Sequence, residues 1–233
     1  MNIVLATTTF YKTLGDLRAA LAIKMVEAAT KCGYPVSVVD DSPEEIRRAI
    51  QTAGALVSPQ RQKGMGASRR QTIEVARDLA KPDGIIVWLE PEKHTFVPLI
   101  AEVCQPFEND PALDLIIPRR RSLGSYPPMQ QLAEELGREG FRLATGRALD
   151  SWFGPQAFRA RVAHYYLNYD GQPDLWDSTH LPPARIVRAG HKVAEVVVDY
   201  THPSEQLEEA TFTFYQHRIR QLATLTQALT NNL

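Results

Sequence analysis

The first half of the chain alternates short apolar segments with longer segments whose apolar residues recur every three to four positions. Short, uninterrupted apolar segments are typical of strands buried on both faces of a parallel sheet, and the wider spacing is typical of amphipathic helices. The sequence therefore predicts an α/β fold with a mostly parallel central sheet flanked by helices. The expected strands cover residues 2–6, 35–40, 55–57, 84–89 and 113–117, and the expected helices cover 14–32, a segment from Pro43 capped by Ser42, 63–81 and 96–107.

The second half has a less regular pattern, and we expect it to complete a single domain over residues 1–233. The expected elements are a loop containing Arg119–Arg121, helices near 130–139 and 155–166, a long functional loop at 170–183, a strand at 191–199 and a long helix at 205–229.

The charge balance excludes some classes of protein. The chain has 26 Lys and Arg against 27 Asp and Glu, whereas proteins dedicated to nucleic acids or anionic membranes usually have a basic excess. Two cysteines cannot form a disulfide scaffold or a cysteine-rich zinc site. No segment approaches the roughly 18 apolar residues that a membrane span requires, and no signal peptide is evident, so we expect a cytoplasmic protein.

Polar side chains follow four of the predicted strands. Because ligands of open α/β sheets bind beyond the carboxyl ends of the strands, these side chains are the candidates for function. The combination of carboxylates and cations at one edge fits a phosphate-containing ligand bridged by a metal. The candidates are Thr7 and Thr8 after the first strand, Asp40 and Asp41 after the second, a glycine-rich basic segment after the third, and Glu90 and Glu92 after the fourth.

Glu90 and Glu92 are two residues apart in an extended segment, so their side chains project from the same face. Pro91 fixes one backbone torsion between them. Carboxylates so placed suit Mg²⁺ or Mn²⁺, which take oxygen ligands and share them with substrate phosphates. The alternative is a solvated strand end.

Two further groups are candidates for binding the nucleotide and its phosphates. Asp40 is placed to accept hydrogen bonds from a base or ribose, although Asp41 and Ser42 also suit a helix cap. A glycine-rich segment lets the backbone approach a phosphate, and arginine forms bidentate bonds to phosphate. The alternatives are an ordinary glycine-containing loop and arginines that are simply exposed to solvent. The residues of the second group are Gly64, Gly66, Arg69 and Arg70, with Arg119 and Arg121 for phosphate or acceptor.

The predicted loop at 170–183 holds the remaining candidates. Asp177 follows Trp176, and a carboxylate beside an indole is a candidate general base. His180 is a candidate third metal ligand, although a lone histidine is more often structural.

Taken in order, these motifs resemble GT-A-type glycosyltransferases, especially the broad family-2 group that includes dolichyl-phosphate-mannose synthase-like enzymes. The resemblance implies a sugar donor bound as a nucleotide diphosphate, with a nucleotide-binding half at 1–121 and an acceptor half with the C-terminal helix at 122–233. It also implies that Glu90 and Glu92 hold the metal and that Asp177 activates the acceptor, as in inverting members. The matching segments are 3–7, 38–42, 64–70, 86–94, 115–121 and 188–196.

The sequence departs from that family in three ways. Its acidic motif is Glu-Pro-Glu instead of Asp-x-Asp, no glycine follows Asp41, and no Gln-x-x-Arg-Trp motif is present. We therefore expect a metal-dependent glycosyltransferase acting on a small or soluble acceptor. A sugar-phosphate nucleotidyltransferase and a non-catalytic nucleotide-binding protein are the alternatives.

Overall fold

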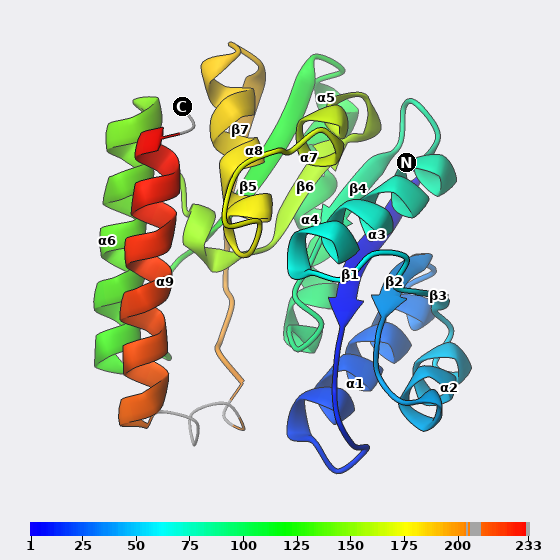
Figure 1. Ribbon diagram of the computed structural model, residues 1–233. Helices are drawn as coiled ribbons and strands as arrows, with labels where there is room; N and C mark the ends of the chain where they lie inside the picture. The colour runs from blue at the N-terminus through cyan, green and yellow to red at the C-terminus, as the bar shows by residue number, and fades with distance from the viewer. Residues whose placement is uncertain (204, 206–210, 232–233) are drawn as a thin grey trace.

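The computed structural model describes residues 1–203, 205 and 211–231. Its strands form one seven-stranded sheet in the order β3-β2-β1-β4-β6-β5-β7 (Figure 1). The β6 strand runs antiparallel to its neighbours β4 and β5, and the other pairs are parallel. The α/β prediction with a mostly parallel sheet is confirmed. The strands are β1 (Ile3–Thr9), β2 (Val36–Asp40), β3 (Leu56–Pro59), β4 (Ile85–Trp88), β5 (Leu113–Arg120), β6 (Gln156–Arg159) and β7 (Lys192–Val198).

Helices cover both faces of the sheet because neighbouring strand residues point to opposite sides. Leu5 packs into one core, and Val4 into the other. The first face is covered by α1 (Leu17–Lys31), α2 (Glu44–Thr52), η1 (His94–Leu99), α4 (Ile100–Cys104) and α5 (Pro106–Asn109). The second face is covered by α3 (Met65–Ala80), α6 (Pro128–Thr145), α7 (His164–Leu167), α8 (Asp177–Arg188) and α9 (Phe212–Asn231). Of the two short 3-10 turns, η2 (Ser151–Phe153) contributes Phe153 to the first core and η3 (Ala160–Val162) contributes to the second.

Several predicted elements are wrong. The helix expected at 155–166 is β6 followed by η3 and α7, and β5 extends through Arg120 instead of ending before a loop. Ser42 does not cap α2, because its hydroxyl donates to Asp40 and accepts the N–H of Tyr11. Part of the helix expected at 205–229 lies outside the described residues. None of the helices in the described part of the chain is long and apolar enough to cross a membrane.

The loop expected at 170–183 is also wrong in its second half, where α8 contains Pro182 and Pro183. A proline in a helix lacks the N–H that would bond to the carbonyl four residues earlier. The carbonyl that Pro183 leaves free, that of Thr179, accepts a hydrogen bond of 2.7 Å from the Gln156 amide. The Gln156 Oε1 in turn accepts the Tyr166 hydroxyl at 2.6 Å. A side chain of β6 thus replaces the missing helical bond.

We expect Gln156→Leu to lower the free energy of unfolding by about 1–3 kcal/mol, because it leaves the buried Thr179 carbonyl and Tyr166 hydroxyl without partners. Urea denaturation followed by circular dichroism measures the loss. Adding Tyr166→Phe removes one orphaned group and should recover part of it. Full stability of Gln156→Leu would contradict this explanation of the proline-containing helix.

Candidate active site

A cavity of about 250 Å³ lies beyond the carboxyl end of β4. Its walls come from α1, α3, the segment after β4, α6, η2, α8 and α9, which are far apart in sequence. The cavity gathers four of the predicted site residues: Arg69, Glu90, Glu92 and His180. The other predicted site residues are not part of its lining.

Glu90 and Glu92 reach the cavity from a tight turn, closed by a 3.1 Å hydrogen bond from the Lys93 N–H to the Glu90 carbonyl. The Glu90 carboxylate lies against Gly154, where a β-carbon would come within 1.8 Å of Oε1. Its buried Oε2 has no hydrogen-bond partner among the described residues. The Glu92 carboxylate accepts the Tyr11 hydroxyl at 3.1 Å, and burial raises the pKa of Glu92. Glu90 therefore has an oxygen available to a ligand.

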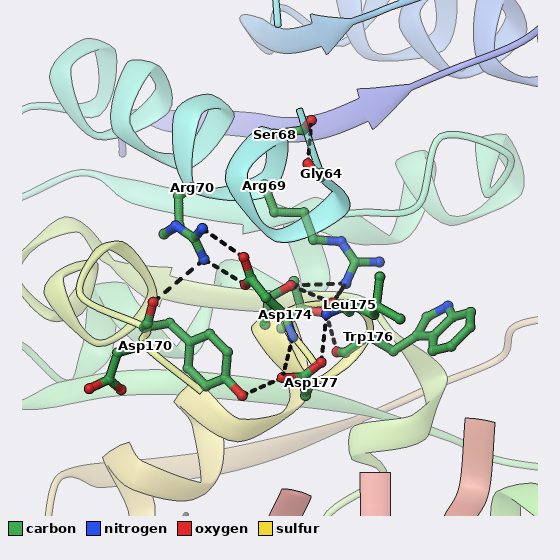
Figure 2. A network of polar contacts seen from close by, with 12 residues as sticks. Gly64, Ser68, Arg69, Arg70, Asp170, Asp174, Leu175, Trp176 and Asp177 are labelled. Atoms are coloured by element: carbon green, nitrogen blue, oxygen red, sulfur yellow. Dashed lines mark hydrogen bonds and ion pairs between the residues drawn. The ribbon is translucent and has the colours of Figure 1, made fainter. Parts of the chain in front are cut away.

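Arg69 is the cation on the α3 side of the cavity. Its Nη1 donates to the Leu175 carbonyl at 2.7 Å (Figure 2). Its guanidinium carbon lies 5.3 Å from the Trp88 ring centroid. Burial lowers the pKa of Arg69 to about 10, an effect that Glu90 opposes, so the group is charged at neutral pH. Its Nε has no hydrogen-bond partner among the described residues. Arg69 thus combines a fixed position with an unused donor.

Lys93 is a second cation of the cavity lining, and it was not among the residues predicted from the sequence. Its Nζ lies 4.8 Å from the ring centroid of Phe153 and 5.6 Å from that of Tyr200. Although burial opposes it, Glu90 helps to raise the pKa of Lys93. The aromatic rings and the carboxylate both favour the charged ammonium in this position.

His180 lines the cavity from α8, with its Nδ1 2.7 Å from the Trp176 carbonyl oxygen. Because a carbonyl only accepts, Nδ1 carries the proton of the neutral ring and Nε2 keeps a lone pair. Burial lowers the pKa of His180, which favours that neutral ring. His180 is therefore a hydrogen-bond acceptor.

The carboxylates fit a cation that shares its ligands with a phosphate. Among the residues that the structure describes, no three His, Cys, Asp or Glu side chains are grouped to hold a metal, so His180 does not complete a set with Glu90 and Glu92. Mg²⁺ is often held by one or two carboxylates together with substrate phosphates. The unpartnered Glu90 Oε2, with Glu92 in the same cavity, suits that arrangement.

Asp177 is not placed to act as a general base. Its side chain is fully buried at the start of α8, where Oδ1 accepts the Leu175 N–H at 2.7 Å and Oδ2 accepts the Asp174 N–H at 3.2 Å (Figure 2). The Tyr169 hydroxyl also donates to Oδ2. These bonds order the turn before α8, so the prediction of a catalytic Asp177 is corrected to a structural role.

The glycine-rich segment binds the same turn instead of an open phosphate site. The Gly66 N–H donates to the Asp174 carbonyl at 3.0 Å, and a β-carbon on Gly66 would come within 1.8 Å of the Asp174 carboxylate. The Gly64 carbonyl accepts the Ser68 N–H and hydroxyl. Arg70 forms a bidentate pair with Asp174 at 2.6 and 2.8 Å (Figure 2). The Gly66 N–H and the Arg70 guanidinium, which were predicted to bind phosphate, are therefore occupied.

Asp40 is at the predicted strand end but is enclosed. Its fully buried carboxylate accepts the Thr9 and Ser42 hydroxyls, both at 2.6 Å, which leaves it closed to a base or ribose. Asp41 is exposed beside it. Thr7 is buried within β1 and Thr8 half-buried, both away from the cavity lining. Asp40 and Asp41 thus lie at the expected end of β2, whereas Thr7 and Thr8 lie inside β1 because that strand continues to Thr9, and none of the four lines the cavity.

The arginines at the end of β5 differ in environment. Arg121 is exposed and paired with Asp199, and Arg119 is half-buried. Arg120, which was not a candidate, is fully buried between Asp150 at 2.7 Å and Glu134 at 2.8 Å. Neither Arg119 nor Arg121 lines the cavity, so the prediction that they bind phosphate or acceptor there is not supported.

Sequence reasoning missed several lining residues. Lys93 stands next to the predicted carboxylate pair, so its position in the chain was a usable signal. Arg18 and the α9 residues carried no such signal, because they lie outside the predicted motifs. The packing of α9 beside α6 places the α9 residues near the cavity (Figure 1). The missed α9 residues are Phe214, His217, Arg218 and Gln221.

A scan against protein-family models and a search of curated proteins find no match. Solved structures do match. Glucosyl-3-phosphoglycerate synthase from Mycobacterium tuberculosis, with phosphoglyceric acid, superposes with a TM-score of 0.63 at 12% identity, covering 97% of this chain and 80% of the other. Mannosyl-3-phosphoglycerate synthase from Rubrobacter xylanophilus gives 0.60 at 11%, covering 99% and 75%.

A third match is the synthetase for CMP-2-keto-3-deoxy-manno-octonic acid, complexed with CTP, with a TM-score of 0.57 at 14% identity, covering 95% and 100%. The chain has the GT-A-like fold. The recognition of that fold from sequence motifs is confirmed. At these sequence identities the similarity shows the fold alone, and the reaction depends on the residues of the site.

Proposed function

We propose that the protein is a metal-dependent glycosyltransferase that moves a sugar from a nucleotide-diphosphate donor to a small or soluble acceptor. The observation that carries this proposal is the meeting of Glu90 and Glu92 with Arg69 and Lys93 in one cavity at the carboxyl end of β4. Paired carboxylates beside fixed cations suit a diphosphate bound through a divalent cation.

In this proposal Glu90 and Glu92 hold Mg²⁺ or Mn²⁺, and Arg69 donates its unused Nε–H to a phosphate oxygen. The cation, when bound, neutralises charge on the diphosphate leaving group. Arg69 contributes to the same stabilisation because it is held in place before the donor arrives. His180 accepts a hydrogen bond from a sugar hydroxyl through Nε2.

The bound molecules of the matched structures support this assignment. One structure of the mycobacterial glucosyl-3-phosphoglycerate synthase holds Mn²⁺, UDP-glucose and phosphoglyceric acid. A cavity of about 250 Å³ lies just below the roughly 300–1,000 Å³ of most small-molecule sites, so it fits the diphosphate and sugar better than a complete donor. The inverting mechanism required Asp177 as the base. Because backbone N–H groups bond to the Asp177 carboxylate, that mechanism is not part of the proposal.

A sugar-phosphate nucleotidyltransferase is the second candidate, because the CTP-bound synthetase has the same fold. That reaction needs a site for a triphosphate, whereas the glycine-rich segment here is occupied by Asp174. A protein that binds a nucleotide without turnover is the third candidate. The cytoplasmic location expected from the sequence stays a prediction.

We expect a nucleotide-sugar, with Mn²⁺ present, to raise the melting temperature of the protein, because a ligand that binds the native state stabilises it. A panel of UDP-, GDP- and CMP-sugars, each with Mn²⁺ or EDTA, identifies the donor. Release of a nucleoside diphosphate with the acceptor present supports glycosyl transfer. Pyrophosphate release from a nucleoside triphosphate and a sugar phosphate contradicts it, as does binding with no turnover of any donor.

A further inference from the structure

Helices α6 and α9 lie side by side at one edge of the molecule and leave apolar side chains exposed along the groove between them (Figure 1). Among the described residues, six of the thirteen exposed large apolar side chains lie on these two helices of 18 and 20 residues. Exposed apolar patches of this kind often mark interaction sites. The six side chains are Met129, Leu132, Leu136 and Leu143 of α6 with Phe212 and Ile219 of α9.

The four apolar side chains of α6 form one stripe along the helix. They are separated by three, four and seven residues, a spacing that places them on the same side of a helix. Gly140 continues the stripe between Leu136 and Leu143, and a β-carbon on it would meet no atom within 4 Å. Glycine lowers helix stability relative to alanine. The bare backbone at this open position therefore suits the close approach of another helix.

The charges beside this stripe make it self-complementary. Glu135 and Arg142 are both exposed on α6, and their separation of seven residues places them on the same flank of the stripe. When two copies of one helix pack antiparallel about a two-fold axis, each contact occurs twice with its residues exchanged. With the axis between Arg138 and Glu139, Glu135 faces the partner's Arg142, and Arg142 faces the partner's Glu135.

The same arrangement brings the apolar groups together. Leu136 would lie over the partner's Gly140, where no side chain obstructs it, and Leu132 would lie beside the partner's Leu143. A pattern of charges that pairs with itself favours a second copy of this chain over a partner with an unrelated surface.

We propose that this face of α6, with the adjoining side of α9, is the interface of a homodimer in which the two α6 helices pack antiparallel. Each dimer then contains two ion pairs between Glu135 and Arg142 of different chains, which flank an apolar contact. The inference is independent of the proposed function, because none of the α6 residues in this contact lines the cavity.

Sedimentation equilibrium of the full chain tests the proposal. The wild type should have twice the chain mass of 26.1 kDa at micromolar concentration. Leu136→Glu should raise the dissociation constant of the dimer by about 100-fold or more, because each dimer then holds two carboxylates in an apolar contact. Leu79→Glu, the same change at an exposed leucine of α3, is the matched control and should leave the dimer intact.

Gly140→Gln is a second variant that tests the close approach of the helices. Glutamine favours a helix more than glycine does, and Gly140 has open space around it, so the chain should remain folded. Its side chain should nevertheless weaken the dimer, because it keeps the two helices apart. Circular dichroism checks the folding of every variant.

Charge reversal tests whether the occupant is a second copy. Glu135→Arg alone and Arg142→Glu alone should each weaken the dimer by about tenfold, because like charges then face each other. Mixing the two variants should restore a dimer, since each reversed side chain then faces an opposite charge. Arg142 also pairs with Glu139 in its own helix, so the mixture is compared with each variant by itself.

A wild type that is monomeric at every concentration would overturn the inference, as would a dimer that Leu136→Glu and Gly140→Gln leave unchanged. Failure of the two charge-reversed variants to pair would contradict the antiparallel arrangement. A monomer that binds phosphatidylcholine vesicles, and loses that binding in Leu136→Glu, would assign the face to a membrane and also overturn the inference.

Discussion

Replacing Glu90 and Glu92 together by glutamine should lower sugar transfer by about 100-fold or more while leaving the protein folded. The substitution keeps the shape of both side chains but removes the two charges that hold the cation, whose stabilisation of the leaving group amounts to several kcal/mol. The protein should stay folded, because Glu90 Oε2 has no hydrogen-bond partner to lose among the described residues and glutamine at position 92 keeps an acceptor for the Tyr11 hydroxyl. It should lose some stability, because Arg69 and Lys93 lose the negative charge of Glu90 that favours their charged forms. Steady-state transfer rates and thermal unfolding of the same samples measure both effects.

Glu108→Gln is the matched control, since Glu108 is exposed on α5 and distant in sequence from the turn. It should retain wild-type activity. Undiminished transfer by the double variant, or transfer that persists in EDTA, would show that the carboxylate pair has no metal-binding role. A double variant that fails to fold would instead contradict the stability argument.

Replacing Arg120 by methionine should lower the free energy of unfolding by about 3–5 kcal/mol, the usual cost of leaving buried charges unpaired. The Arg120 guanidinium is fully buried and bonds to Asp150 and Glu134, both of which are nearly buried themselves. Although burial opposes it, these two carboxylates raise the pKa of Arg120, so the arginine remains charged. Urea denaturation measures the loss.

A triple variant tests whether the unpaired charges cause that loss. Adding Glu134→Gln and Asp150→Asn to Arg120→Met removes both orphaned carboxylates and should recover a large part of the stability. Arg121→Met should have little effect on stability, because its arginine is exposed and ion pairs on the surface are screened by solvent. A small effect of Arg120→Met, or no recovery in the triple variant, would contradict the role of this ion-pair network.

The features that the sequence predicted correctly are those encoded by residues close together in the chain. The parallel strands and the carboxylates that follow β4 were predicted because apolar segments and the residues after them are adjacent in the chain. Arg69 and His180 were predicted to belong to the site, and both line the cavity with Glu90 and Glu92. Their individual roles stay predictions.

Predictions were wrong where a residue bonds to a partner that the sequence pattern did not indicate. Asp177 looked available because it follows Trp176, but the backbone of the preceding turn occupies its carboxylate. Pro182 and Pro183 argued against a helix, but the Gln156 side chain from β6 bonds to the carbonyl that Pro183 leaves free. Gly66 and Arg70 suggested a phosphate site, but they bind Asp174, a long way along the chain.

The position of α9 in the chain has a consequence for how the protein matures. This helix supplies part of the cavity lining, and Arg18 of α1 supplies another part. The cavity therefore brings together segments from nearly the whole length of the chain. Contacts between such distant segments form late, because closing long loops costs entropy before the contacts repay it. During translation, every strand emerges from the ribosome before α9, and a nascent chain with a folded sheet still lacks that part of the lining.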